Sequence, residues 1–288
     1  LDAAQNLEDS DSVAIALYNI GDLGIRTGNF PLARQYLERS ISICRDIKNH
    51  ELEANNLINL GIVCMYSGEW REGLVYFKQA LQKNRNWHFA DEESWTLSLL
   101  GFACMELCTF QEGFEYLDQA LQICNQTGNR RVEGFSWFNR CTIYLPMGNY
   151  AAARHAAEVC EVHYKAIGDL RGLAWLSYTH SRIARQQGNY STAQTLLEEA
   201  HQAFINLGDW MGLGFATHNL GRLAAELDDA VKARALYEQA LSLFQKIGCH
   251  TGESQCFHSL GVLYRQQGDI PAAYTHLHKA LEIRRPIT

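Results

Sequence analysis

The stretch NLGIVCMYSGEW, residues 59–70, places a glycine inside a pattern that otherwise indicates an amphipathic helix. Similar strings return as NLGRLAAELDDA from Asn219 and as SLGVLYRQQGDI from Ser259. A glycine in a helix interior costs about 1 kcal/mol relative to alanine. Because a missing side chain lets another helix approach closely, the recurring glycine predicts tight contacts between helices.

This glycine belongs to a column of small residues that recurs every 40 residues along the chain. Turn signals such as GEW at Gly68 and GDI at Gly268 keep the same step. Long-period self-similarity of this kind indicates a repeat protein. The column consists of Gly21, Gly61, Gly101, Cys141, Ser181, Gly221 and Gly261, and it defines seven repeats at approximately residues 10–49, 50–89, 90–129, 130–169, 170–209, 210–249 and 250–288.

Each repeat is expected to form two helices of about 16 residues, or roughly 24 Å. In the second repeat, apolar residues follow one another at helical spacings of three and four on both sides of a break at Ser67-Gly68-Glu69. One pair of short helices cannot bury its apolar faces alone, so the repeats must stack on one another. Pro146, late in the first helix of repeat four, is expected to end or kink that helix.

The small and apolar columns resemble the tetratricopeptide repeat pattern over nearly the whole chain. A period of 40 rather than about 34 residues is similar to the longer class found in kinesin light chains, Pins-type adaptors, bacterial peptide sensors and sensor domains of signalling ATPases. The resemblance implies an all-α fold, a right-handed α-solenoid of seven helix-turn-helix repeats forming a single domain over 1–288. In the second repeat the matching residues are Leu57, Leu60, Gly61, Cys64, Gly73, Phe77 and Ala80.

Charge and composition exclude several classes of protein. The net charge of −7 argues against a nucleic-acid partner, because such proteins usually carry a basic face. No apolar run approaches the roughly 20 residues that cross a bilayer, so no membrane partner is expected. Nine scattered cysteines fit a reducing, cytoplasmic setting. The start lacks both a methionine and a signal peptide, which favours a piece excised from a longer protein.

The chain carries no recognisable catalytic motif. It lacks a phosphate-binding Walker A string, the HExxH metalloprotease motif and a nucleophile elbow. Cys104 and Cys108 share one helix face, but a metal would need further ligands. We therefore expect no enzymatic activity, no catalytic residues, no metal and no cofactor.

The resemblance implies a concave groove lined by the first helix of each repeat. Aromatic residues concentrate there in repeats three to five, and arginines concentrate in repeats five to seven. Aromatic and arginine side chains are typical of binding hot spots, and arginines suit carboxylates or phosphates. The candidate groove residues are Asn19, Asn59, Trp95, Phe102, Phe135, Phe138, Asn139, Trp175, Tyr178, Arg182, Arg185, His218, Asn219, Arg222 and Arg265.

Each group of candidate residues also has a purely structural interpretation. The aromatic residues can pack between neighbouring helices, and the arginines can form a solvated helix face. The asparagines, which precede the small column by two positions, can hold the backbone of a peptide, since an amide both donates and accepts. They can equally cap turns or bridge helices within the solenoid.

These features favour a scaffold or sensor module that binds a protein or peptide partner with acidic groups. A small-molecule sensor of a bacterial signalling or transcription-regulating ATPase is a first alternative. Self-assembly into a homo-oligomer through terminal repeats is a second, because no polar capping helix follows the last repeat.

Overall fold

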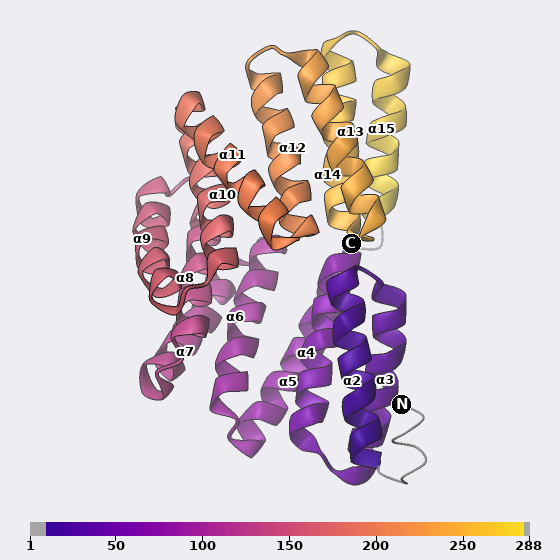
Figure 1. Cartoon of the computed structure of the whole chain (residues 1–288), viewed down its shortest axis with the longest axis vertical. Coiled ribbons are helices and arrows are strands. Elements are labelled where there is room, and N and C mark those ends of the chain that lie inside the picture. The colour runs from indigo at the N-terminus through magenta and orange to yellow at the C-terminus, as the bar shows by residue number, and fades with distance from the viewer. Residues whose placement is uncertain (1–9, 285–288) are drawn as a thin grey trace. The chain divides into compact units, whose positions relative to one another are not determined.

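The computed structural model describes residues 10–284, and this part of the chain consists of fourteen helices without a strand (Figure 1). The expected all-α repeat fold is confirmed. The first helices of the repeats are α2 (Ser10–Thr27), α4 (His50–Ser67), α6 (Ala90–Glu106), α8 (Arg130–Tyr144), α10 (Leu170–Gln186), α12 (Trp210–Glu226) and α14 (His250–Gln266). The second helices are α3 (Phe30–Ile47), α5 (Trp70–Trp87), α7 (Phe110–Thr127), α9 (Tyr150–Ile167), α11 (Tyr190–Leu207), α13 (Ala230–Lys246) and α15 (Ile270–Arg284).

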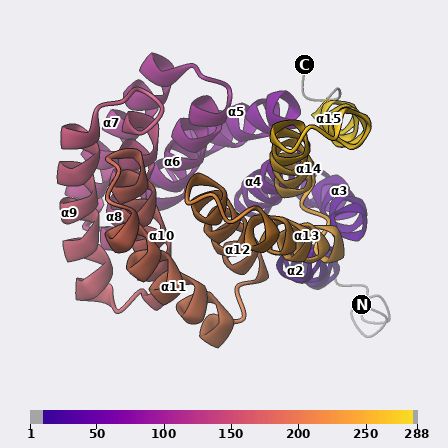
Figure 2. The same ribbon diagram turned by 90° about the horizontal axis from the view of Figure 1, so that it is seen from above.

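The helices form two compact units, one ending at Ile143 and the other beginning at Tyr144. In the N-terminal unit the first helices α2, α4 and α6 contact one another in order, and in the C-terminal unit α10, α12 and α14 do the same. Figure 2 shows α12, α13 and α14 following one another side by side. Each unit therefore presents a row of first helices with the second helices packed behind it.

The recurring glycine sits where the two helices of one repeat touch. A Cβ atom added at Gly61 would lie 2.4 Å from the Phe77 ring, and one added at Gly101 would lie 2.6 Å from Leu117. The partner is in each case the residue sixteen positions later, on the second helix of the same repeat. The close approach expected from the sequence is thus the contact that holds each pair together.

Turns between the helices use glycine and short polar side chains in separate roles. Gly68 ends α4 with a φ of 83°, a left-handed conformation that glycine adopts at little cost. Asn49, before α4, and Asp209, before α12, each accept a hydrogen bond from a backbone N–H in the first turn of the helix that follows.

Repeat four departs from this regular pattern. Helix α8 ends at Tyr144, two residues before Pro146, and is shorter than the other first helices. Proline disfavours helical backbone at the residue before it, so the helix stops early. The boundary between the two compact units falls at this same place. No helix in residues 10–284 is both long and apolar enough to cross a membrane, and eight of the nine cysteines are buried.

Substitution of Gly61 by alanine is a useful test, because helix propensity and packing predict changes of opposite sign in the free energy of unfolding. Propensity alone predicts that Gly61→Ala stabilises α4 by about 1 kcal/mol. The clash with Phe77 predicts a loss of about 1–3 kcal/mol, measured as the free energy of unfolding in urea.

The double variant G61A/F77A is the control for this test. If the clash causes the loss, the double variant loses less than the sum of the two single variants. A stabilising effect of Gly61→Ala would show that the helices of this pair are not in close contact.

Candidate functional site: the rows of first helices

Aromatic side chains of repeats three and four meet on the N-terminal unit. The rings of Trp95 and Phe135 have centroids 4.9 Å apart, and Phe135 stacks on Phe138 at 6.5 Å. Phe102 contacts Trp70 edge-on at 6.0 Å. Phe138 is buried, whereas Trp95, Phe102 and Phe135 keep part of their surface exposed. We call these three half-buried residues the aromatic row.

In the C-terminal unit the aromatic side chains serve mainly to join repeats five and six. Trp175 lies 5.1 Å from Phe204 and 6.1 Å from Phe215, measured between ring centroids, and its Nε1 donates to the Asp209 carboxylate at 3.3 Å. Tyr178 meets Trp175 edge-on at 5.5 Å and is buried. Much of this cluster therefore performs the packing role that the sequence left open.

The asparagines link first helices of successive repeats. The Asn219 side chain donates to the Tyr178 hydroxyl at 2.8 Å, and Asn139 donates to the backbone carbonyl of Ser98 at 3.0 Å. His218 and Ser259 share a hydrogen bond of 2.9 Å. Each of these contacts joins residues 41 positions apart. For Asn139 and Asn219 the structure thus shows the bridging role.

Asn19 and Arg265, the predicted residues nearest the ends of the chain, stand apart from these contacts, whereas Asn59 lies beside Tyr18 of the preceding repeat, 41 positions earlier. Asn19 on α2 and Arg265 on α14 are both exposed, whereas Asn59 is buried on α4. The structure therefore brings together two groups of predicted residues, the aromatic row of the N-terminal unit and a set around Tyr178 in the C-terminal unit.

Three arginines of the C-terminal unit form this second group, which we call the arginine cluster: Arg182, Arg185 and Arg222. Arg185 is buried and forms an ion pair with Glu226. The Arg182 guanidinium lies 5.9 Å from the centroid of the Tyr178 ring. Arg222 is half-buried and has no hydrogen-bond or ion-pair partner among residues 10–284. Among these three arginines, Arg185 alone forms an ion pair with a carboxylate of residues 10–284.

Burial and charge repulsion act on the groups around Arg222. Burial, followed by the positive charge of Arg185, lowers the pKa of the Arg222 guanidinium. Burial, followed by the charge of Arg222, lowers the pKa of His218 to about 3, so this imidazole is neutral at pH 7. The positive charge of this region therefore comes from the arginines.

Glu226 is a neighbour of the predicted site residues that sequence reasoning missed. It pairs with Arg185 across a separation of 41 residues, the same offset that joins Tyr178 to Asn219 and His218 to Ser259. The sequence did contain a signal for this pair. Contacts between adjacent first helices join residues 41 positions apart, one more than the repeat length, and Glu226 lies 41 positions after Arg185.

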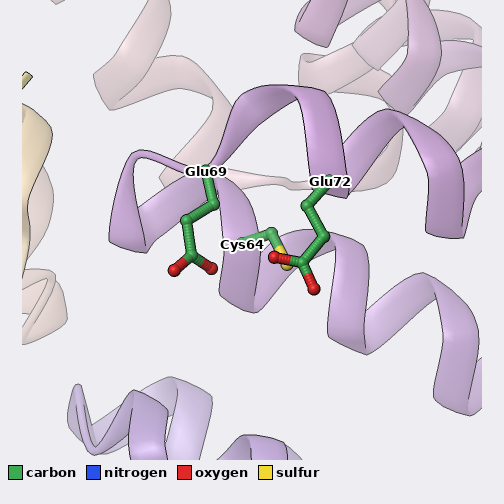
Figure 3. Close-up of side chains that lie close together, drawn as sticks. All are labelled: Cys64, Glu69 and Glu72. Carbon is green, nitrogen blue, oxygen red and sulfur yellow. The ribbon is translucent and has the colours of Figure 1, made fainter. Parts of the chain in front are cut away.

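A thiol and two carboxylates gather at the junction of α4 and α5, where Figure 3 shows Cys64, Glu69 and Glu72. Arg34 from the preceding repeat pairs with Glu69, lies 3.0 Å from a Glu72 oxygen and donates to the Cys64 sulfur at 3.3 Å. Burial raises the pKa of Cys64 to about 12, so the thiol stays protonated. Because metals bind thiolate and carboxylate groups that are not already paired, this group is best explained as an ion-pair link between repeats.

The sequence matches the profile of the tetratricopeptide repeat at residues 1–86, 172–246 and 214–286, which together make up more than half of the chain. This chain belongs to the tetratricopeptide repeat family. The arrangement of paired helices in both units agrees with that assignment. No curated protein matches the sequence.

Solved structures of tetratricopeptide repeat proteins resemble the chain at low identity. A Rap protein complexed with competence and sporulation factor matches with a TM-score of 0.76 and 13% identity, covering 94% of this chain and 74% of the other. The Rap conjugation gene regulator of plasmid pLS20, in complex with the Phr* peptide, matches with a TM-score of 0.76 and 14% identity, covering 94% of this chain and 73% of the other. A signal transduction ATPase with a tetratricopeptide repeat sensor, from Pyrococcus horikoshii, matches with a TM-score of 0.61 and 15% identity. The match covers 94% of this chain and 44% of the other. These similarities establish the fold.

The buried, neutral His218 predicts a loss of stability in mild acid. Its pKa is about 3 in the folded protein and about 6.5 in the unfolded chain, so between these values the unfolded state binds more protons. The stability that it contributes is complete above pH 6.5 and is lost as the pH falls toward 3, at up to about 1.4 kcal/mol per pH unit. Burial also lowers the pKa values of His180, His201 and His258.

Urea unfolding between pH 6.5 and 4.5 measures this effect. His218→Gln is expected to flatten the pH dependence of the free energy of unfolding by nearly one proton. Equal slopes for His218→Gln and the unaltered chain would contradict a neutral, buried His218.

Proposed function

We propose that this tetratricopeptide repeat protein is a binding module that holds an extended peptide along its rows of first helices. The observation that carries the proposal is the aromatic row, in which Trp95, Phe102 and Phe135 contact neighbouring rings yet stay partly exposed. Binding hot spots commonly contain rigid aromatic side chains that are already partly desolvated before the partner binds. Ordering such side chains on binding costs little conformational entropy.

The spacing of the first helices suits an extended peptide. Neighbouring packed helices lie about 8–10 Å apart, and an extended chain advances about 3.3 Å per residue. Each repeat thus corresponds to about three peptide residues. The first helices of the N-terminal unit, α2 to α8, would accompany a segment of about nine residues.

The structural relatives support a peptide as the ligand. The two Rap structures are complexes, one with competence and sporulation factor and one with the Phr* peptide. A third relative, NprR, was solved with its cognate peptide NprX, and it matches this chain with a TM-score of 0.65 and 12% identity. Each complex belongs to that relative, and for this chain a peptide ligand is our proposal. Binding of this kind needs no catalytic group.

A selection from a displayed library of random 12-residue peptides against the immobilised chain tests the proposal. Phe102→Ala and Phe135→Ala are each expected to weaken the selected peptides about tenfold or more, because each removes an aromatic contact. Affinity is measured by fluorescence anisotropy, and the melting temperature of each variant confirms that it is folded.

Trp87→Ala is the matched control, since Trp87 is an exposed aromatic residue on a second helix. It should change peptide affinity less than twofold. Peptides that lose affinity with Trp87→Ala but not with Phe102→Ala or Phe135→Ala would place binding on the second helices and overturn the proposal.

A further inference from the structure

The arginine cluster carries more positive charge than its surroundings balance. On α10, Tyr178, Arg182 and Arg185 are four and three residues apart, which places them on one helix face. On α12, Asn219, Arg222 and Glu226 share a face by the same spacing. These faces meet, because Asn219 donates to Tyr178 and Arg185 pairs with Glu226.

The cluster thus contains three guanidinium groups and one carboxylate, that of Glu226, which forms its ion pair with Arg185. A guanidinium carries five N–H donors in a fixed plane. Those of Arg222 find no acceptor among residues 10–284, although the side chain is half-buried. The nearby charge of Arg185 repels it, and the repulsion is stronger at a partly buried position than in water.

The positive region extends to the next first helix. His258 on α14 has its pKa lowered by burial and then by Arg284, Arg222 and Arg265. Tyr178 at the centre is influenced by all three arginines of the cluster, although burial raises its pKa overall. His258, on the next first helix, therefore lies within reach of the positive charge of Arg222.

We propose that Arg182, Arg185 and Arg222 form a site for a phosphoryl group carried by a peptide that is bound along the first helices of the C-terminal unit. After Glu226 is counted, the cluster has an excess of about two positive charges, which a phosphoryl group with its roughly −1.5 to −2 charges would neutralise in one place. Planar guanidinium groups bind such oxygens in pairs. The site rests on the proposed function in that the phosphoryl group belongs to a peptide.

Thermal unfolding of the whole chain in inorganic phosphate tests the site without any peptide. Phosphate is expected to raise the melting temperature saturably, by about 2–4 °C, because it binds only the folded state. Sodium acetate and sodium chloride at equal ionic strength should not reproduce the shift. A general salting effect of phosphate would not saturate and would act on all variants alike.

Arg222→Gln should remove the saturable shift and, in phosphate-free buffer, should itself raise the melting temperature. The reason is that it removes a charge that is disfavoured first by burial and then by the repulsion from Arg185. Arg154→Gln, at an exposed arginine on α9 in the same unit, should leave both readouts unchanged. A lower melting temperature for Arg222→Gln together with an intact phosphate shift would make Arg222 a structural residue and overturn the proposal. An equal shift in acetate would overturn the assignment to a phosphoryl group.

A second arm uses peptides from the library selection, synthesised with serine or phosphoserine. The phosphorylated form should bind at least tenfold more tightly to the unaltered chain and lose that advantage with Arg222→Gln. If phosphate binds through Arg222 but no peptide is selected, the anion site stands and the peptide function fails. If peptides bind through the aromatic row but phosphorylation adds nothing, the peptide function stands and the anion site fails.

Discussion

The contact on which the structure depends is the approach of one helix to its partner at a position that has no side chain. Phe77, Leu117 and Tyr237 each occupy the space that a Cβ atom would fill at the glycine sixteen residues before them. The pair gains more from this buried contact than glycine costs in helix propensity. Once the pair is fixed, the first helices of neighbouring repeats lie side by side and side chains form the links between repeats.

Those links use a different physical principle from the contacts within a pair. Within a repeat the contact is apolar and depends on shape. Between first helices it is frequently polar, as in the bonds from Asn139 to Ser98 and from Asn219 to Tyr178. Hydrogen bonds have directional geometry, so they fix the register of one repeat on the next more narrowly than apolar packing does. The Arg34 ion pairs between the first two repeats act in the same way.

The sequence predicted the fold well because small-residue columns, turn glycines and apolar spacing all carry the 40-residue period. It also predicted the early end of α8, since the effect of Pro146 is local. The candidate site was harder to predict, because a position on a helix face does not tell what lies opposite. Arg185, expected on an open face, is buried against Glu226, and Asn139 is buried against a backbone carbonyl. Such roles depend on which residue occupies the adjoining repeat.

The 41-residue offset has a consequence for how such a chain can change during evolution. Each polar link has one member in each of two neighbouring repeats, so replacing one 40-residue block alters the links on both of its sides. An asparagine before the small column tolerates such exchange, because it pairs with a backbone carbonyl in one repeat and a tyrosine hydroxyl in another. The pair formed by Arg185 and Glu226 does not, since either residue alone would be left with an unbalanced charge. Shuffling of repeats is therefore expected to preserve repeats five and six as one inherited block.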